Sequence, residues 1–197
     1  MNTKEKIKES ALQLFLTKGY AVGVNEIIKK AGTSKGAFYH HFSSKGQLFI
    51  DTIDKFFFGF MNEIEEINGA RLNFREKIAL LVKNTYAPFK SLNYLIQERE
   101  QLNYLSIMAE YPNHENLRVK RISYFSRFIE SFSKIIETAK DEGKIMSKVD
   151  AGTLSFQLLM LIDGSIFNAI LMYNSVDKAE EACLLAVNQM LDMVEQD

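Results

Sequence analysis

A short stretch near the N-terminus carries the side chains best suited to bind another molecule. Four of them are of types that hydrogen-bond phosphate oxygens: Ser34, Lys35, Tyr39 and Lys45. Gly36 and Ala37 lie among them and are small enough to allow close approach to a base edge or a thymine methyl group. The stretch therefore predicts contacts to a nucleic acid, and His40 is a further candidate for a phosphate or base contact.

The formal net charge of −1 is unevenly distributed along the 197 residues. Residues 1–50 hold eight lysines and three glutamates, a charge of +5, whereas the other 147 residues hold 16 basic and 22 acidic side chains, a charge of −6. Such asymmetry is typical of a protein whose basic end faces a polyanion. A solvated lysine-rich surface would explain the same charge, and charge alone does not decide between the two.

The candidate residues lie in a predicted helix-turn-helix. Apolar residues follow helical spacing over residues 24–31, which Gly32 ends, and an aromatic pair one turn apart marks a second short helix over 35–41. When the two helices pack through their apolar faces, the second is free to enter a major groove about 12 Å wide. A preceding helix is expected over residues 2–18, where Asn2 and Glu5 have the spacing of a capping box.

The remaining sequence is also typical of helices, because apolar residues recur every three to four positions and alternating stretches are scarce. We expect an all-α fold whose further helices run over residues 44–69, 73–90, 94–110, 113–143, 150–173 and from 175 to the C-terminus. Residues 154–173 are nearly all apolar, but Asp163 at their middle makes a membrane span costly, so we expect a helix buried within protein and no membrane contact. The last two helices, over about 150–195, suit a bundle or a subunit interface.

The sequence offers no pattern for catalysis. It contains no Gly-rich phosphate loop, Gly-x-Ser-x-Gly turn or His-Glu-x-x-His motif, and the adjacent His40 and His41 point about 100° apart on a helix and cannot share a metal on one face. The single cysteine, Cys183, is expected to be buried packing rather than a redox sensor. Asp163 is expected to be a hydrogen-bonded acid at a helix contact rather than an effector ligand. We therefore expect no enzyme, no metal and no cofactor.

The middle helices are rich in aromatic and methionine side chains, most of which we expect in the core. Binding sites between helices are usually apolar with a few polar groups, so some of these side chains are candidates to line a pocket. The candidates are Met61, Tyr86, Phe89, Tyr104, Met108, Phe125, Phe128 and Met160. The N-terminal residues are polar and lysine-rich with no apolar run after them, which predicts a cytoplasmic protein.

Residues 19–49 resemble a known DNA-binding domain. Gly19-Tyr20, the run from Val24 to Phe42 that contains SKGAFYHHF, and the run from Lys45 to Phe49 are similar to TetR-type (TetR/AcrR) transcriptional regulators over about the first 50 residues. The resemblance implies a helix-turn-helix DNA-binding domain over 1–45 and a helical ligand-binding and dimerisation domain over 46–197. It also implies a recognition helix and a phosphate contact from the following helix, and the expected DNA-binding residues are Thr33, Ser34, Lys35, Gly36, Ala37, Tyr39, His40 and Lys45. Gly23 departs from the Thr or Ser common in the family and has no hydroxyl for a phosphate.

These observations predict a ligand-responsive repressor. We expect it to bind a palindromic operator in double-stranded DNA as a homodimer, joined through the last two helices, and to be released by a largely apolar small-molecule effector. Activation rather than repression stays open, because the sequence does not separate the two. The rival interpretation is a helical small-molecule-binding protein or enzyme without DNA binding, in which the basic N-terminus is a solvated surface.

Overall fold

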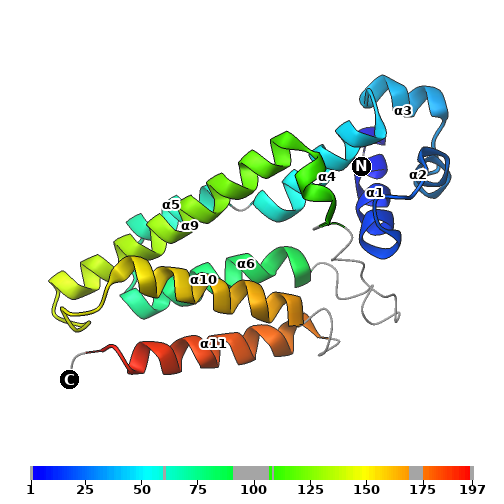
Figure 1. Ribbon diagram of the computed structural model, residues 1–197. Helices are drawn as coiled ribbons and strands as arrows, with labels where there is room; N and C mark the ends of the chain where they lie inside the picture. Colours follow the sequence, from blue (N-terminus) through cyan, green and yellow to red (C-terminus); the bar gives the residue numbers. More distant parts are fainter. Residues whose placement is uncertain (1, 60, 91–106, 108, 169–174, 196–197) are drawn as a thin grey trace. The chain divides into compact units, whose positions relative to one another are not determined.

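The computed structural model describes residues 2–59, 61–90, 107, 109–168 and 175–195, and all of its regular elements are helical (Figure 1). The α-helices are α1 (Thr3–Lys18), α2 (Val24–Ala31), α3 (Lys35–His41), α4 (Lys45–Phe58), α5 (Met61–Gly69), α6 (Phe74–Lys90), α9 (Glu115–Asp141), α10 (Ala151–Asn168) and α11 (Val176–Asp192). A short 3₁₀ helix, η1, covers Tyr111–Asn113. The predicted all-α fold is confirmed. Most of the predicted helix over 94–110 lies outside the described residues.

Side-chain caps fix the beginnings of several helices, and in four of them the capping residue is Asn2 or a serine. The side chains of Asn2, Ser34, Ser44 and Ser175 each accept a hydrogen bond from the backbone N–H three residues on, over 2.9, 3.1, 3.1 and 3.3 Å. Each bond satisfies an amide that has no partner within the helix. All four starts agree with the predicted helix starts.

The predicted single helix over residues 44–69 is wrong in one respect, because α4 ends at Phe58 and α5 begins at Met61. Gly59 caps α4, and a Cβ atom at this position would collide with the carbonyl oxygen of Lys55. Only a glycine accepts so close an approach of the backbone, and the regular helix ends there.

The chain forms two compact units. Unit 1 comprises the described residues within Met1–Gly59 and Glu98–Arg121, and unit 2 those within Phe60–Gln97 and Ile122–Asp197. Unit 1 therefore contains α4 as well as the first three helices. The expected domain ranges, 1–45 and 46–197, stay predictions.

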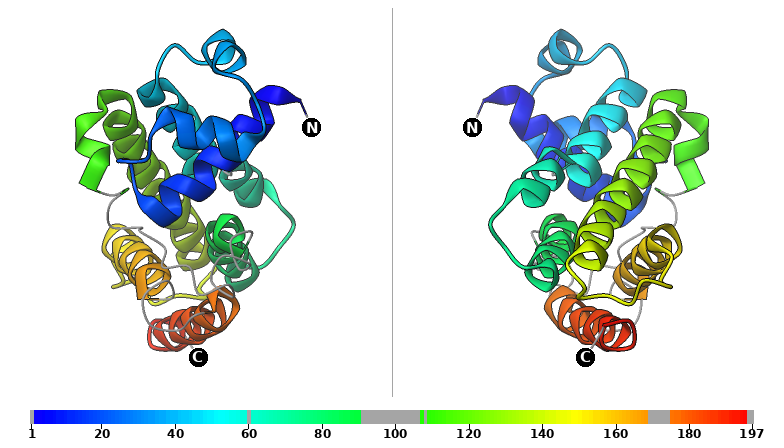
Figure 2. Two further views of the ribbon diagram at one scale, coloured as in Figure 1. Left: turned by 90° about the vertical axis from the view of Figure 1, so that its right-hand side faces the viewer. Right: turned by 90° about the vertical axis from the view of Figure 1, so that its left-hand side faces the viewer.

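In unit 1, α1 packs against α2, α3 and α4. The aromatic rings of Phe15 on α1 and Phe49 on α4 meet edge to face, 5.0 Å apart. The buried core of this unit includes Ile7, Phe15, Ile27, Phe38, Phe42, Leu48, Phe49 and Ile53. Both views in Figure 2 show α3 at the outer edge of this unit, which leaves one of its sides to solvent.

In unit 2, α11 packs against α6 and α10, and α5 packs against α6. Tyr86 of α6 is fully buried, and its hydroxyl lies 2.5 Å from the Ser165 hydroxyl of α10 and 3.4 Å from the Ala179 carbonyl of α11, to which it donates. A single phenol thus ties three helices together. Among the described residues, no helix is both long enough and apolar enough to cross a membrane.

Candidate nucleic-acid interface

The second short helix of the predicted helix-turn-helix, α3, buries one side and exposes the other. Phe38 is fully buried against the core of unit 1, whereas the next residue, Tyr39, has half of its surface exposed. Lys35, Gly36 and His40 are exposed as well. The structure thus brings the predicted DNA-binding residues of α3 together on its solvent side, with Thr33 and Ala37 half-buried at the margin.

The turn before α3 depends on a glycine. Gly32 has φ +61°, in the left-handed region that L side chains rarely adopt. Its N–H donates to the carbonyl of Lys29 and the N–H of Thr33 to that of Ile28, over 3.3 and 3.2 Å. These bonds close the end of α2 and set the direction in which α3 leaves it.

Gly36 differs from Gly32, because nothing within the chain requires a glycine there. Its φ is ordinary, and a Cβ atom would meet only the Ser34 hydroxyl, at 3.8 Å. The space above this position is therefore open to solvent. That openness suits the close approach of an outside molecule to the backbone of α3.

The lysines of unit 1 fall into two groups. Lys18 pairs with Glu26, and Lys55 pairs with Glu5 at 3.0 Å, where the hydrogen bond from Lys55 lowers the pKa of the Glu5 carboxyl. Lys29, Lys30 and Lys35 are exposed and form no ion pair with the described residues. Lys4 and Lys6 of α1 are also exposed and form no ion pair with the described residues, so the unpaired charges lie on α1 as well as on α2 and α3.

Lys45, the predicted phosphate contact, is held by a tyrosine that the sequence interpretation did not assign a role. Its ammonium donates to the carbonyl oxygen of Tyr20 over 2.7 Å and lies 4.1 Å from the centre of the Tyr20 ring. These contacts fix the ammonium at the start of α4 while leaving two of its three donors for another acceptor. No local pattern could have revealed this pair, because 25 residues separate its members.

The predicted pocket residues are more scattered. Tyr86, Phe89 and Phe128 are buried, Phe125 is half-buried and Met160 is exposed. Tyr104, Met108 and the side chain of Met61 lie outside the described residues. These eight residues therefore stay candidates for a ligand pocket.

A groove of about 340 Å³ lies between α10 and α11 in unit 2. Its lining consists of Met160, Leu161, Gly164, Ser165, Asn168, Ala179, Ala182, Cys183 and Ala186. Cys183 is 2% exposed, and burial raises the pKa of its thiol, which favours the unreactive protonated form. Asp163 of the same region is half-buried.

Comparisons with known proteins find a match to a family model within unit 1. Residues 7–52 match the family model described as bacterial regulatory proteins, tetR family. An uncharacterized HTH-type transcriptional regulator of Bacillus subtilis, YuxN, is 39% identical over 90 residues, covering 43% of this chain and 31% of the relative. The HTH-type transcriptional repressor NemR of Escherichia coli is 27% identical over 90 residues, covering 45% of each chain. The chain thus spans less than half the length of these relatives.

The fold similarity extends further than the sequence similarity. The crystal structure of a TetR transcription regulator from Haloarcula marismortui matches with a TM-score of 0.77 over 98% of both chains, at 18% sequence identity. At this identity the match concerns the fold alone. Both units of this chain therefore have counterparts in a solved structure.

Proposed function

We propose that the chain is a transcriptional regulator of the TetR/AcrR type and that it represses transcription by inserting α3 into the major groove of double-stranded DNA, and the match of residues 7–52 to the tetR family model supports this. The observation that carries the proposal is the two-sided character of α3. Phe38 anchors one side in the core, while Lys35 and Tyr39 stand exposed on the other. The relative NemR, 27% identical over 90 residues, is named a transcriptional repressor, which supports this direction of regulation.

The proposed contacts divide into two kinds. Lys35, Tyr39 and His40, with Thr33 and Ser34, would reach phosphates and base edges from α3, and Gly36 and Ala37 would allow the backbone to come close to the bases. Lys45 would bind a phosphate from the start of α4. Three unpaired lysines, Lys29, Lys30 and Lys35, would add an attraction to DNA that weakens as salt rises.

We propose that the protein acts as a homodimer joined through α10 and α11. Large apolar side chains stand exposed on and next to both helices: Phe156 and Met160 on α10, Leu185 on α11, and Met193 directly after α11, each with 38% to 71% of its surface accessible. The groove between these helices is lined with small residues such as Gly164 and Ala182, which allow close helix approach. A second copy of the chain is the occupant that we propose for this surface, because a twofold-symmetric dimer matches a palindromic operator with half-sites about 34 to 36 Å apart.

We further propose that a largely apolar small molecule binds between the helices of the protein and releases the protein from DNA. The candidates for its pocket are the eight residues named above, of which Tyr86 and Phe128 lie in the buried core. A ligand can act only by binding one state more tightly, and a coupling of about 1 to 3 kcal/mol would change operator affinity about 5- to 150-fold. Such a regulator would work in the cytoplasm, where bacterial DNA is accessible.

Selection of bound sequences from random double-stranded DNA tests the proposal directly. The expected result is enrichment of one palindrome whose half-sites are about one helical turn apart. A reporter gene carrying that palindrome then separates repression from activation, since a repressor lowers its output. Failure to enrich any palindrome would overturn the proposal and favour a helical small-molecule-binding protein without DNA binding.

A further inference from the structure

His114 lies at the start of α9, where it joins that helix to unit 1. Its carbonyl oxygen accepts hydrogen bonds from the N–H groups of Leu117 and Arg118, both 3.0 Å, so it caps the helix. Its side chain is 14% exposed, and its Nε2 lies 3.2 Å from a carboxylate oxygen of Glu110. The imidazole is therefore largely enclosed within unit 1, although its Nε2 forms no hydrogen bond with the described residues.

Two aromatic rings of unit 1 pack against this imidazole. The ring of Tyr20 meets it edge to face with centroids 5.4 Å apart, and the ring of Phe49 lies 5.2 Å away. Gly46, in the first turn of α4, completes the contact: a Cβ atom there would lie 3.7 Å from His114 Cε1 and 3.5 Å from the Tyr20 hydroxyl. His114 thus occupies the space beside the first turn of α4.

Tyr20 is also the residue that holds Lys45. The Lys45 ammonium lies over the Tyr20 ring and donates to the Tyr20 carbonyl oxygen. The position of the ammonium therefore depends on where the tyrosine lies. The tyrosine ring in turn is bounded by Phe15, Phe49 and His114, at centroid distances of 6.2, 4.8 and 5.4 Å.

We propose that His114 is a positioning residue for the phosphate contact of Lys45, acting through the ring of Tyr20 that lies between them. This inference rests on the proposed function, because it assigns His114 a part in DNA binding. His114 touches no phosphate itself. Without the His114 ring, the Tyr20 ring gains room to move, and the Lys45 ammonium is no longer held in one position.

His114 stands at the beginning of a helix that runs through both units. Residues 115–121 of α9 belong to unit 1 and residues 122–141 of the same helix belong to unit 2. The residue proposed to position Lys45 is therefore joined along the chain to a helix that continues into unit 2.

A double-mutant cycle on the palindrome selected by the wild-type protein tests the inference. The Kd is measured for the wild type, His114→Ala, Lys45→Ala and the double variant at about 50 and 200 mM salt. Each single variant should bind more weakly than the wild type. Because a dimer would lose two phosphate contacts, the slope of log Kd against log salt should be smaller by about 2. The ratio of the variant Kd to the wild-type Kd should therefore differ about tenfold between the two salt concentrations. The double variant should bind no more weakly than Lys45→Ala alone.

Two controls separate positioning from a general structural role. His114→Phe keeps a ring against Tyr20 and should restore wild-type affinity, whereas Arg118→Ala, on the exposed first turn of α9, should change neither Kd nor salt slope. Should His114→Ala melt below the assay temperature, Tyr20→Leu takes its place in the cycle, because it removes the same ring support from Lys45.

Two results would overturn the inference. One is an unchanged Kd and salt slope for His114→Ala, and the other is a loss of affinity that adds fully to that of Lys45→Ala. A wild-type protein that binds no DNA would instead refute the proposed function, before any variant is compared.

Discussion

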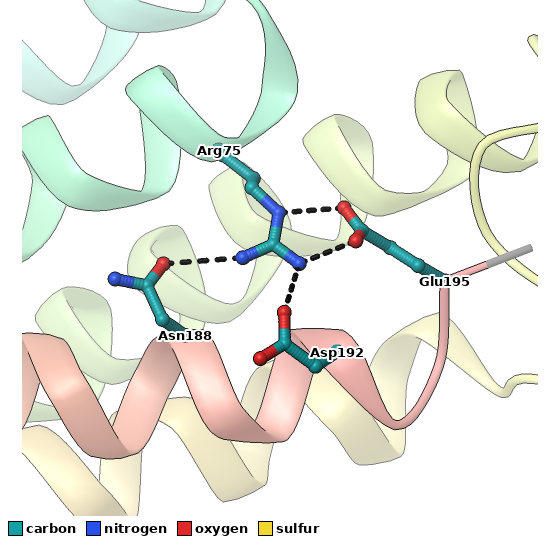
Figure 3. Close-up of polar contacts among 4 residues, drawn as sticks. All are labelled: Arg75, Asn188, Asp192 and Glu195. Atoms are coloured by element: carbon teal, nitrogen blue, oxygen red, sulfur yellow. Dashed lines mark hydrogen bonds and ion pairs between the residues drawn. The ribbon is translucent and has the colours of Figure 1, made fainter. Parts of the chain in front are cut away.

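Removal of the Arg75 guanidinium should destabilise unit 2 by separating the start of α6 from the end of α11. Figure 3 shows Arg75 reaching from α6 toward three side chains near the end of the chain. Its Nε and Nη2 donate to the two carboxylate oxygens of Glu195, the first over 2.6 Å, and Nη2 also donates to Asp192 over 2.6 Å. A longer bond of 3.4 Å reaches Asn188. The substitution Arg75→Met keeps much of the apolar stem and removes every one of these bonds.

The size of the expected loss in the free energy of unfolding depends on how exposed Arg75 and its acidic partners are. A hydrogen bond to a charged group contributes about 1.5 to 3 kcal/mol, whereas a solvent-exposed ion pair contributes about 0 to 1 kcal/mol. Arg75 and Glu195 are 30% and 31% exposed, and Asp192 is 64% exposed, so the two-pronged bond to Glu195 dominates and Asp192 adds little. The same hydrogen bond is the main cause that raises the pKa of Arg75. We expect a net loss of about 1 to 2 kcal/mol.

Thermal and urea unfolding followed by circular dichroism measure this loss. For a chain of this size, about 1 to 2 kcal/mol corresponds to a fall in Tm of about 2 to 8 °C. The loss should shrink in about 1 M salt, because salt screens exposed charges. The matched control is Lys144→Met, which removes an exposed pair with Glu142 and should cost about 0.5 kcal/mol or less. An Arg75→Met variant no less stable than this control would refute the reasoning.

Four further predictions concern stability, DNA binding and assembly. Burial raises the pKa of Tyr86, so the folded state resists ionisation of the phenol. The stability that the neutral phenol contributes should be intact below its pKa in the unfolded state, about 10, and should be lost as the pH rises above that value. The urea midpoint of Tyr86→Phe should not show this loss. Gly32→Ala should lower the free energy of unfolding by about 1 to 2 kcal/mol because φ is +61°. Gly36→Ala should leave the melt unchanged but weaken operator binding, as seen by anisotropy. A charge at the proposed dimer surface, in Phe156→Asp or Leu185→Arg, should produce monomers in sedimentation velocity, and unchanged dimers would contradict that interface.

Much of the fold followed from local chemistry. The starts of α1, α3, α4 and α11 were predictable because a capping side chain and the amide that it binds lie three residues apart. The turn at Gly32 was predictable for the same reason, since a glycine after an amphipathic helix favours the left-handed conformation. The exposed residues of α3 follow from the burial of Phe38, because helical spacing then places Tyr39 on another side.

The break after α4 could not be predicted from apolar spacing, which continues through Gly59 without interruption. The last helix shows a second limit: Ala182 and Leu191 are both apolar, yet Ala182 is exposed whereas Leu191 is buried. Periodicity identifies an apolar face but does not say which neighbour covers it, and α11 has apolar residues on two faces. The exposed Leu185 belongs to the second face.

Polar contacts between residues far apart in the chain could not be predicted from the sequence. Arg75 and Glu195 are 120 residues apart, and Lys45 lies 25 residues from Tyr20. Such pairs depend on how helices pack, and no local spacing specifies them. Tyr20 stood within the family signature, but its role in holding Lys45 became visible only in three dimensions.

Operator binding by two variants of α3 tests the central claim most directly. Lys35→Ala and Tyr39→Ala are compared with wild type and with Lys83→Ala, an exposed lysine of unit 2, in mobility-shift titrations on the selected palindrome at fixed salt. Both α3 variants should fail to shift the operator, although their circular dichroism melts should be unchanged. Lys83→Ala should bind as the wild type does. Normal operator binding by both α3 variants would contradict the assignment of α3 as the helix that reads DNA.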